Sequence, residues 1–262
     1  MSQTPQDLLQ QLRIEPPFRL RLVPLLVVIG LTVIVVFGSG MLAFLSAQLF
    51  HTALPQQSLV KALYVQHSIQ LVLGLIAIAV LKFRFVHADF GLHWPRGKTY
   101  IGSALAIGVL FGVLMTLVDY APEIIAHSFA HAGWPPGYPL GHGDVWRWIV
   151  FGAYAGPTEE IPLRALLVTY LAATMPGKLR IGRFSMNWAG VIVAIIFALL
   201  HATSFIVVSW PLALGQQIYA FAIAVLYAYW LEKSQSIVAP IIGHGLSDLV
   251  ETLIVFACMG LL

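Results

Sequence analysis

Long apolar stretches separated by short polar segments fill the chain from residue 22 onward. Each stretch is close to the roughly 20 residues that an α-helix needs to cross the hydrocarbon core of a bilayer. The expected spans lie at about 22–46, 60–81, 100–119, 146–174, 188–208, 212–231 and 237–260. An extra buried segment in the fourth stretch, or in the loop before it, would add an eighth. The pattern predicts an all-α, polytopic membrane helix bundle with seven or eight transmembrane helices.

The distribution of polar residues divides this predicted bundle into three regions. Residues 1–21 form a polar leader, for which we expect a surface helix broken at Pro16 and Pro17. Residues 22–145 hold three spans without a catalytic motif, followed by the longest loop. Residues 146–262 contain the charged residues that interrupt apolar spans, and they form the candidate functional core.

Composition supports a membrane protein and narrows the possible partners. The chain is 59% hydrophobic and 10% charged, whereas soluble domains carry about 25% charged residues. We therefore expect the lipid bilayer as a partner and no nucleic acid. The single cysteine, Cys258, excludes a disulfide within one chain and any site with several cysteine ligands.

Basic residues lie mainly in alternate gaps between the predicted spans. Eleven of the fourteen occupy these gaps and the leader: Arg13, Arg19, Arg21, Lys82, Arg84, Arg96, Lys98, Lys178, Arg180, Arg183 and Lys233. The opposite side has only Lys61 and Arg147, both at span edges. The positive-inside rule then predicts a cytoplasmic N-terminus and an external C-terminus. The expected location is a plasma membrane, in a bacterium the inner membrane.

Three ionisable residues stand within six positions of the fourth span: Glu159, Glu160 and Arg164. A charged side chain at membrane depth costs at least about 2.5 kcal/mol, so it is usually paired and functional. Glu160 and Arg164 are four apart and can pair on one helix face. Glu159 points about 100° away and is available for another partner. Pro157 and Pro162 are expected to break this helix and to leave a wet cavity beside the glutamates.

Two later spans carry further polar residues. His201 lies in the fifth span, and His244 and Asp248 lie four apart on one face of the seventh. A single buried histidine is more often a satisfied core residue than a catalytic one, and His244 can serve only as a partner for Asp248. The predicted depths of these residues and of Glu159 are similar, however. The spans can therefore bring two carboxylates and two imidazoles to one level.

The longest loop, residues 120–146, contains His127 and His131. Their spacing permits a shared metal ion, but no third ligand stands beside them, so histidines at the membrane interface are the simpler interpretation.

The ordered motifs Glu-Glu-x-x-x-Arg, Phe-x-x-x-His and His-x-x-x-Asp resemble those of the Rce1-like CAAX-protease and bacteriocin-processing family of intramembrane endopeptidases. The matching residues are Glu159, Glu160, Arg164, Phe197, His201, His244 and Asp248. The resemblance covers about residues 150–250. Pro162 and the residues flanking Arg164 depart from the usual pattern, and Asp248 stands where asparagine is common. Pro162 puts the geometry of the Glu160–Arg164 pair in question.

The resemblance implies peptide-bond hydrolysis inside the membrane. Glu159 would act as general base on a water held by His201 and His244, with Asp248 orienting His244 or helping to hold that water. Glu160, Arg164 and Phe197 would support the site or bind the substrate, which would be a membrane-anchored peptide or protein. The resemblance favours a metal-free reaction. Zn²⁺ bound by Glu159, His201 and His244 is the alternative.

Two other classes of protein fit the same residues. Intramembrane acidic and histidine residues beside prolines are also typical of proton- or ion-coupled transporters, although no inverted repeat is evident. A non-catalytic membrane scaffold or immunity protein of the same fold is the third possibility.

Overall fold

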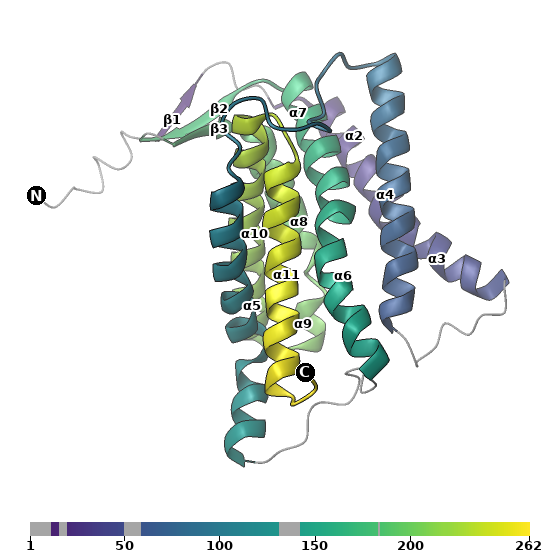
Figure 1. Cartoon of the computed structure of the whole chain (residues 1–262). Coiled ribbons are helices and arrows are strands. Elements are labelled where there is room, and N and C mark those ends of the chain that lie inside the picture. Colours follow the sequence, from purple (N-terminus) through teal and green to yellow (C-terminus); the bar gives the residue numbers. More distant parts are fainter. Residues whose placement is uncertain (1–11, 16–19, 50–58, 131–141, 183) are drawn as a thin grey trace, which may run out of the picture.

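The computed structural model describes residues 12–15, 20–49, 59–130, 142–182 and 184–262, and most of them are helical (Figure 1). The described helices, in chain order, are α2 (Leu22–Thr32), η1 (Val33–Phe37), α3 (Gly38–Leu49), α4 (Leu59–Arg84), α5 (Ile101–Ala130), α6 (His142–Glu160), η2 (Ile161–Val168), α7 (Thr169–Thr174), α8 (Trp188–Leu200), α9 (Ser204–Val207), α10 (Trp210–Ser234) and α11 (Val238–Cys258). The segments η1 and η2 are π-helical.

The helices follow the predicted apolar stretches closely. Within the described residues, six helices are long and apolar enough to cross a membrane: Leu22–Leu49, Leu59–Arg84, Ile101–His127, Trp188–Ile206, Trp210–Ser234 and Val238–Cys258. The fourth predicted span corresponds to the continuous run α6–η2–α7, which carries the charged residues of the candidate site. The chain is therefore a multi-pass membrane protein. The total number of crossings stays a prediction.

A small three-stranded sheet lies at one end of the predicted helix bundle and is an addition to it. Strand β1 (Leu12–Glu15) pairs with β2 (Lys178–Ile181), and β2 pairs with β3 (Phe184–Asn187), both antiparallel. The leader therefore contributes a strand where a surface helix was expected. Its Leu-Arg-Ile-Glu sequence alternates apolar and polar residues, which suits a strand.

The segments rich in basic residues lie at the same end of the bundle. The leader joins residues 178–187 through the sheet, and the connection between α4 and α5 crosses this end as well (Figure 1). That connection bonds to the α10–α11 turn, where the Ile237 N–H donates to the Gly91 carbonyl at 3.0 Å. The C-terminus lies at the other end (Figure 1). The basic segments, which alternate along the chain, therefore lie together at one end of the bundle. The membrane side that they face stays a prediction.

A charged cluster fixes the connection between α4 and α5. Both ring nitrogens of His93 face acceptors, the Trp94 carbonyl at 2.7 Å and the Asp89 carboxylate at 2.8 Å. These two bonds, the carbonyl first, raise the pKa of His93 above its ordinary value. Burial acts to raise the pKa of Asp89, but hydrogen bonds from the Gly91 N–H and from His93 bring it below its ordinary value. Arg96 adds an ion pair to Asp89 at 3.3 Å.

Helix α5 is longer than the sequence predicts. The third span was expected to end at residue 119, before Pro122, but α5 continues through Pro122 to Ala130. Asp119 accepts a hydrogen bond from the Tyr219 hydroxyl at 2.5 Å, so α5 is attached to α10 one turn before the proline. The suggested His127–His131 pair is untested, because residue 131 lies outside the described residues.

Candidate active site

Close packing of α6 against α11 positions the candidate site. A Cβ atom added at Gly156 would lie 2.6 Å from the Ile241 carbonyl oxygen, and one added at Gly245 would lie 2.7 Å from that of Ala153. Neither distance leaves room for a side chain, so the two backbones touch. Helices inside membranes use small residues in this way to approach one another. The contact brings the C-terminal end of α6 to the middle of α11.

Glu160, Arg164 and His244 form a buried ionic network at this contact. Glu160 is fully buried and Arg164 is 1% exposed, and their Oε1 and Nη1 atoms are 2.9 Å apart. The Glu160–Arg164 pair predicted from the four-residue spacing is therefore confirmed. The Nδ1–H of His244 donates to the same Glu160 oxygen at 2.7 Å. The Arg164 guanidinium also lies over the rings of Phe197 and Tyr227, at 4.3 and 5.6 Å from their centroids.

The sequence suggested that the helix carrying the glutamates breaks at its prolines, but it does not. It stays helical through Pro157 and continues as the π-helix η2 from Ile161 onward. Pro162 removes the N–H that would bond to the Thr158 carbonyl. The side chain of Gln70 on α4 supplies the missing donor, with its Nε2 3.1 Å from that oxygen. A donor from another helix thus replaces the lost backbone bond.

Glu159 lies beside two imidazoles without a direct hydrogen bond to either. Its Oε2 is 4.0 Å from Nε2 of His244, and its Oε1 is 3.9 Å from Nε2 of His67. These gaps exceed hydrogen-bond distance, and polar gaps of this size are commonly bridged by water. The Glu159 side chain is 22% exposed, in contrast to that of Glu160. Glu159 is therefore the accessible carboxylate of the two.

The two ring nitrogens of His244 face different carboxylates. Glu160 accepts from Nδ1, while Asp248 Oδ2 lies 3.5 Å from Nε2. We expected Asp248 either to orient His244 or to help hold a water. The short bond to Glu160 orients the ring from the Nδ1 side. Asp248 stands next to the nitrogen that faces Glu159, a position suited to holding a water.

His201 lies at the C-terminal end of α8 and lines the same cavity as Glu159. Its Nδ1–H donates to the Phe197 carbonyl at 3.0 Å, and the two rings are in edge contact at 4.8 Å. The candidate residues from α6, α8 and α11 are thus brought together around one cavity. His201 and Glu159 are not in ion-pair contact among the described residues.

This cavity has a volume of about 240 Å³ and a wall that the sequence analysis missed. Asp119 and Tyr219 form part of it, joined by their hydrogen bond, and Glu251 lines it too. Asp119 was expected at the last position of the third span, as a residue at the end of a helix and not as part of a site. Glu251 lies three residues after Asp248 on α11.

His67 is the most informative residue that the sequence analysis missed. It lies on α4, in a region expected to carry no catalytic motif, and it is 8% exposed. Its ring contacts Glu159 across the 3.9 Å gap and bonds through Nδ1 to the Thr158 hydroxyl at 3.0 Å. The signal in the sequence is a group of polar residues near the start of an apolar stretch: Gln66, His67, Ser68 and Gln70.

The alternative zinc site can be tested on the arrangement of its proposed ligands, Glu159, His201 and His244. Across the described part of the chain, no group of three or more His, Cys, Asp or Glu side chains is arranged to hold a metal ion. Each of the two histidines has its Nδ1 bonded to a protein acceptor, as is usual for metal-ligating histidines, so these bonds are compatible with zinc. Because the described side chains are not gathered around a metal position, no step of the reaction is assigned to a zinc ion.

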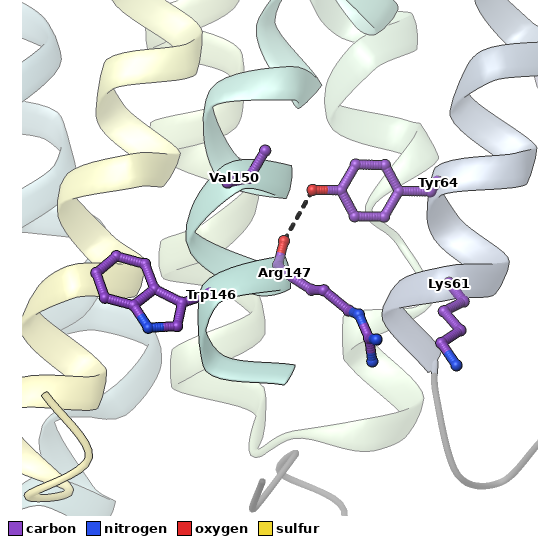
Figure 2. A pocket seen from close by; sticks show the side chains of 5 residues that line it. All are labelled: Lys61, Tyr64, Trp146, Arg147 and Val150. Carbon is purple, nitrogen blue, oxygen red and sulfur yellow. Dashed lines mark hydrogen bonds between the residues drawn. The ribbon is translucent and has the colours of Figure 1, made fainter. Parts of the chain in front are cut away.

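A second cavity, of about 420 Å³, lies between α4 and α6 and is lined by Lys61, Tyr64, Trp146, Arg147 and Val150 (Figure 2). None of these five residues is acidic or a histidine, so the carboxylate chemistry belongs to the first cavity. The Tyr64 hydroxyl donates to the Arg147 carbonyl at 2.9 Å, as Figure 2 shows. This bond ties α4 to α6, the helices that carry His67 and Glu159.

Comparison with known proteins agrees with the motifs. Residues 141–250 match the family model described as type II CAAX prenyl endopeptidase Rce1-like. No curated protein and no solved structure gives a significant match. The matched segment contains every residue of the three motifs, whereas His67 and Asp119 lie outside it. Residues 141–250, the part of the chain that holds the candidate site, are therefore similar to the Rce1-like CAAX prenyl endopeptidases.

Proposed function

We propose that the chain is an intramembrane endopeptidase that cleaves a membrane-associated peptide or protein near its terminus. The observation that carries this proposal is the position of Glu159. Its carboxylate lies in a polar cavity, within 4.0 Å of two imidazoles, and forms no direct hydrogen bond with either. A carboxylate held in this way can bind a water and take its proton.

The proposed reaction begins with a water held by Glu159 together with His201, His244 and Asp248. Glu159 removes one proton while the water oxygen attacks the peptide carbonyl carbon. Nδ1 of His201 and of His244 is already bonded, so the protonated form of either ring has a second N–H, at Nε2, that stabilises the oxyanion that forms. Glu159 then returns the proton to the leaving nitrogen as the C–N bond breaks, which regenerates the carboxylate.

Glu160, Arg164 and Phe197 support this reaction from behind His244. The Glu160 carboxylate fixes the ring of His244, and the Arg164 charge compensates that of Glu160 in a site without solvent. Phe197 contacts both His201 and the Arg164 guanidinium. These contacts restrict the geometry of the two histidines, and such preorganisation is a large part of catalysis by polar groups.

The proposed substrate is a membrane-anchored peptide or protein, and the bilayer is the second partner. The description of the matched family model is that of a prenyl endopeptidase, so a lipidated C-terminal peptide is the first substrate to test. A bacterial plasma membrane is the proposed location.

The test is cleavage of membrane-tethered peptides by the purified protein and by Glu159→Gln, which keeps the shape of the side chain and removes the base. Glu232→Gln makes the same chemical change outside the cavity and serves as the matched control. We expect the Glu159 variant to lose cleavage by at least about 100-fold and the control to retain it. Equal activity of Glu159→Gln and the wild type would refute the proposal.

A proton- or ion-coupled transporter is the second candidate, because Asp119 and Glu251 place two more carboxylates in the same cavity. It predicts flux into vesicles and no cleavage product. A non-catalytic scaffold predicts that the cellular phenotype survives Glu159→Gln.

A further inference from the structure

We infer that His67, on α4, is a positioning residue for the attacking water, held between its Nε2 and Oε1 of Glu159. The inference rests on the proposed function and extends it to a helix outside the segment that matches the family. Three features of the structure support it: the direction of the hydrogen bond at Nδ1, the distance at Nε2 and the packing of α4 on the glutamate helix.

The bond at Nδ1 determines where the His67 ring carries its hydrogen. Thr158 donates its hydroxyl hydrogen to backbone carbonyls of its own helix, those of Tyr154 at 2.9 Å and Ala155 at 3.1 Å. A hydroxyl has one hydrogen, so towards His67 the Thr158 oxygen acts as acceptor. Nδ1 of His67 is therefore the donor of their 3.0 Å bond. In the neutral ring, Nε2 then holds a lone pair.

That lone pair faces another acceptor. Nε2 of His67 and Oε1 of Glu159 are 3.9 Å apart, too far for a direct hydrogen bond. A water between them can donate one hydrogen to each atom, which satisfies both acceptors. The lone pairs of its oxygen are then directed away from the two acceptors. The hydrogen bound to Glu159 leaves as the proton, and His67 accepts a hydrogen bond throughout without taking a proton.

The packing of α4 explains why His67 holds this position. Three α4 residues at helical spacing meet the glutamate helix: His67, Gln70 and Gly74. Gln70 bonds to the Thr158 carbonyl that Pro162 leaves without a donor. A Cβ at Gly74 would lie 2.9 Å from Cγ of Pro162, so the absence of a side chain admits the proline ring. The docking of α4 on Pro162 thus fixes the ring of His67 beside Glu159.

The experiment compares four variants in the cleavage assay: His67→Ala, His67→Gln, Gln70→Leu and Glu159→Gln. We expect His67→Ala to lower kcat by about 100-fold with KM nearly unchanged, because a displaced water affects the chemical step. Glutamine carries a side-chain oxygen that can accept a hydrogen bond near the place of Nε2, so His67→Gln should recover to within about 10-fold of the wild type. Double replacement of His67 and Glu159 should cost no more than Glu159→Gln alone, since both act on one water.

Gln70→Leu is the matched control for a purely structural effect. It removes a buried hydrogen bond to the same Thr158 residue from the same helix, but Gln70 does not face Glu159. If His67 only holds α4 in place, Gln70→Leu and His67→Ala should lower the thermal midpoint and kcat alike, and His67→Gln should not recover; that result overturns the inference. Wild-type kcat in His67→Ala with loss in Glu159→Gln overturns it as well and leaves the proposed function intact. Cleavage retained by Glu159→Gln would overturn the proposed function, and the inference with it.

Discussion

Replacement of Gly156 by alanine tests whether the α6–α11 contact sets the geometry of the site. The added Cβ would lie 2.6 Å from the Ile241 carbonyl oxygen, whereas ordinary contact begins at 3.4 Å, so the helices must separate locally by about 0.8 Å. The bond between His244 and Glu160 is 2.7 Å long. An equal displacement would stretch it to about 3.5 Å, beyond a good hydrogen bond. His244 would lose the contact that orients it.

We expect Gly156→Ala to lower kcat for peptide cleavage by about 100-fold, the usual effect of a 1 Å misplacement, and to cost about 1–3 kcal/mol of stability through overpacking. Gly30→Ala on α2 is the control, because no atom lies within 4 Å of its added Cβ. Cleavage kinetics and thermal unfolding in detergent measure both effects. Wild-type kcat in Gly156→Ala would refute the argument that this backbone contact positions His244.

Three further predictions concern the supporting structure. Arg164→Leu leaves the buried Glu160 without its cation and should destabilise the protein by about 3–5 kcal/mol, measured by thermal unfolding; a change below about 1 kcal/mol would contradict a buried ion pair. Tyr64→Phe removes one hydrogen bond between α4 and α6 and should cost about 0.5–1.5 kcal/mol in the same assay, and an unchanged midpoint would show that the bond adds nothing. Because the pKa of His93 is raised, its contribution to the stability of the α4–α5 connection is complete below about pH 6.5 and is lost as the pH rises through the raised pKa. The pKa of Asp89 is lowered, so the contribution of Asp89 is present above about pH 4. Hydrogen-exchange protection of residues 89–94 should therefore be higher at pH 5.5 than at pH 8, and His93→Asn should abolish the difference.

Features that depend on local sequence could be predicted. The helical stretches follow from runs of apolar residues, because a bilayer requires about 20 of them in succession. Glu160 and Arg164 could be paired because a four-residue spacing places them on one helix face. The same spacing put His244 beside Asp248, where the structure also finds it.

Features that depend on distant partners could not be predicted. The strand at Leu12–Glu15 pairs with Lys178–Ile181, and a local sequence pattern cannot identify a partner so far along the chain. The helix survives Pro162 because Gln70 on another helix replaces the lost donor. His67 has no acidic or basic residue one turn away, so nothing in its own helix indicated that it would meet Glu159.

The most direct test of the account is cleavage of a membrane-tethered peptide by the purified protein and by Glu159→Gln, with and without a chelator, together with elemental analysis of bound metal. We predict that the wild type cleaves, that a chelator leaves its rate unchanged, and that Glu159→Gln lowers the rate at least about 100-fold. If the chelator abolishes cleavage and the protein holds one zinc ion per chain, the attacking water is bound to the metal and not only to carboxylate and imidazole groups. Undiminished cleavage by Glu159→Gln would contradict the central claim that this carboxylate is the base.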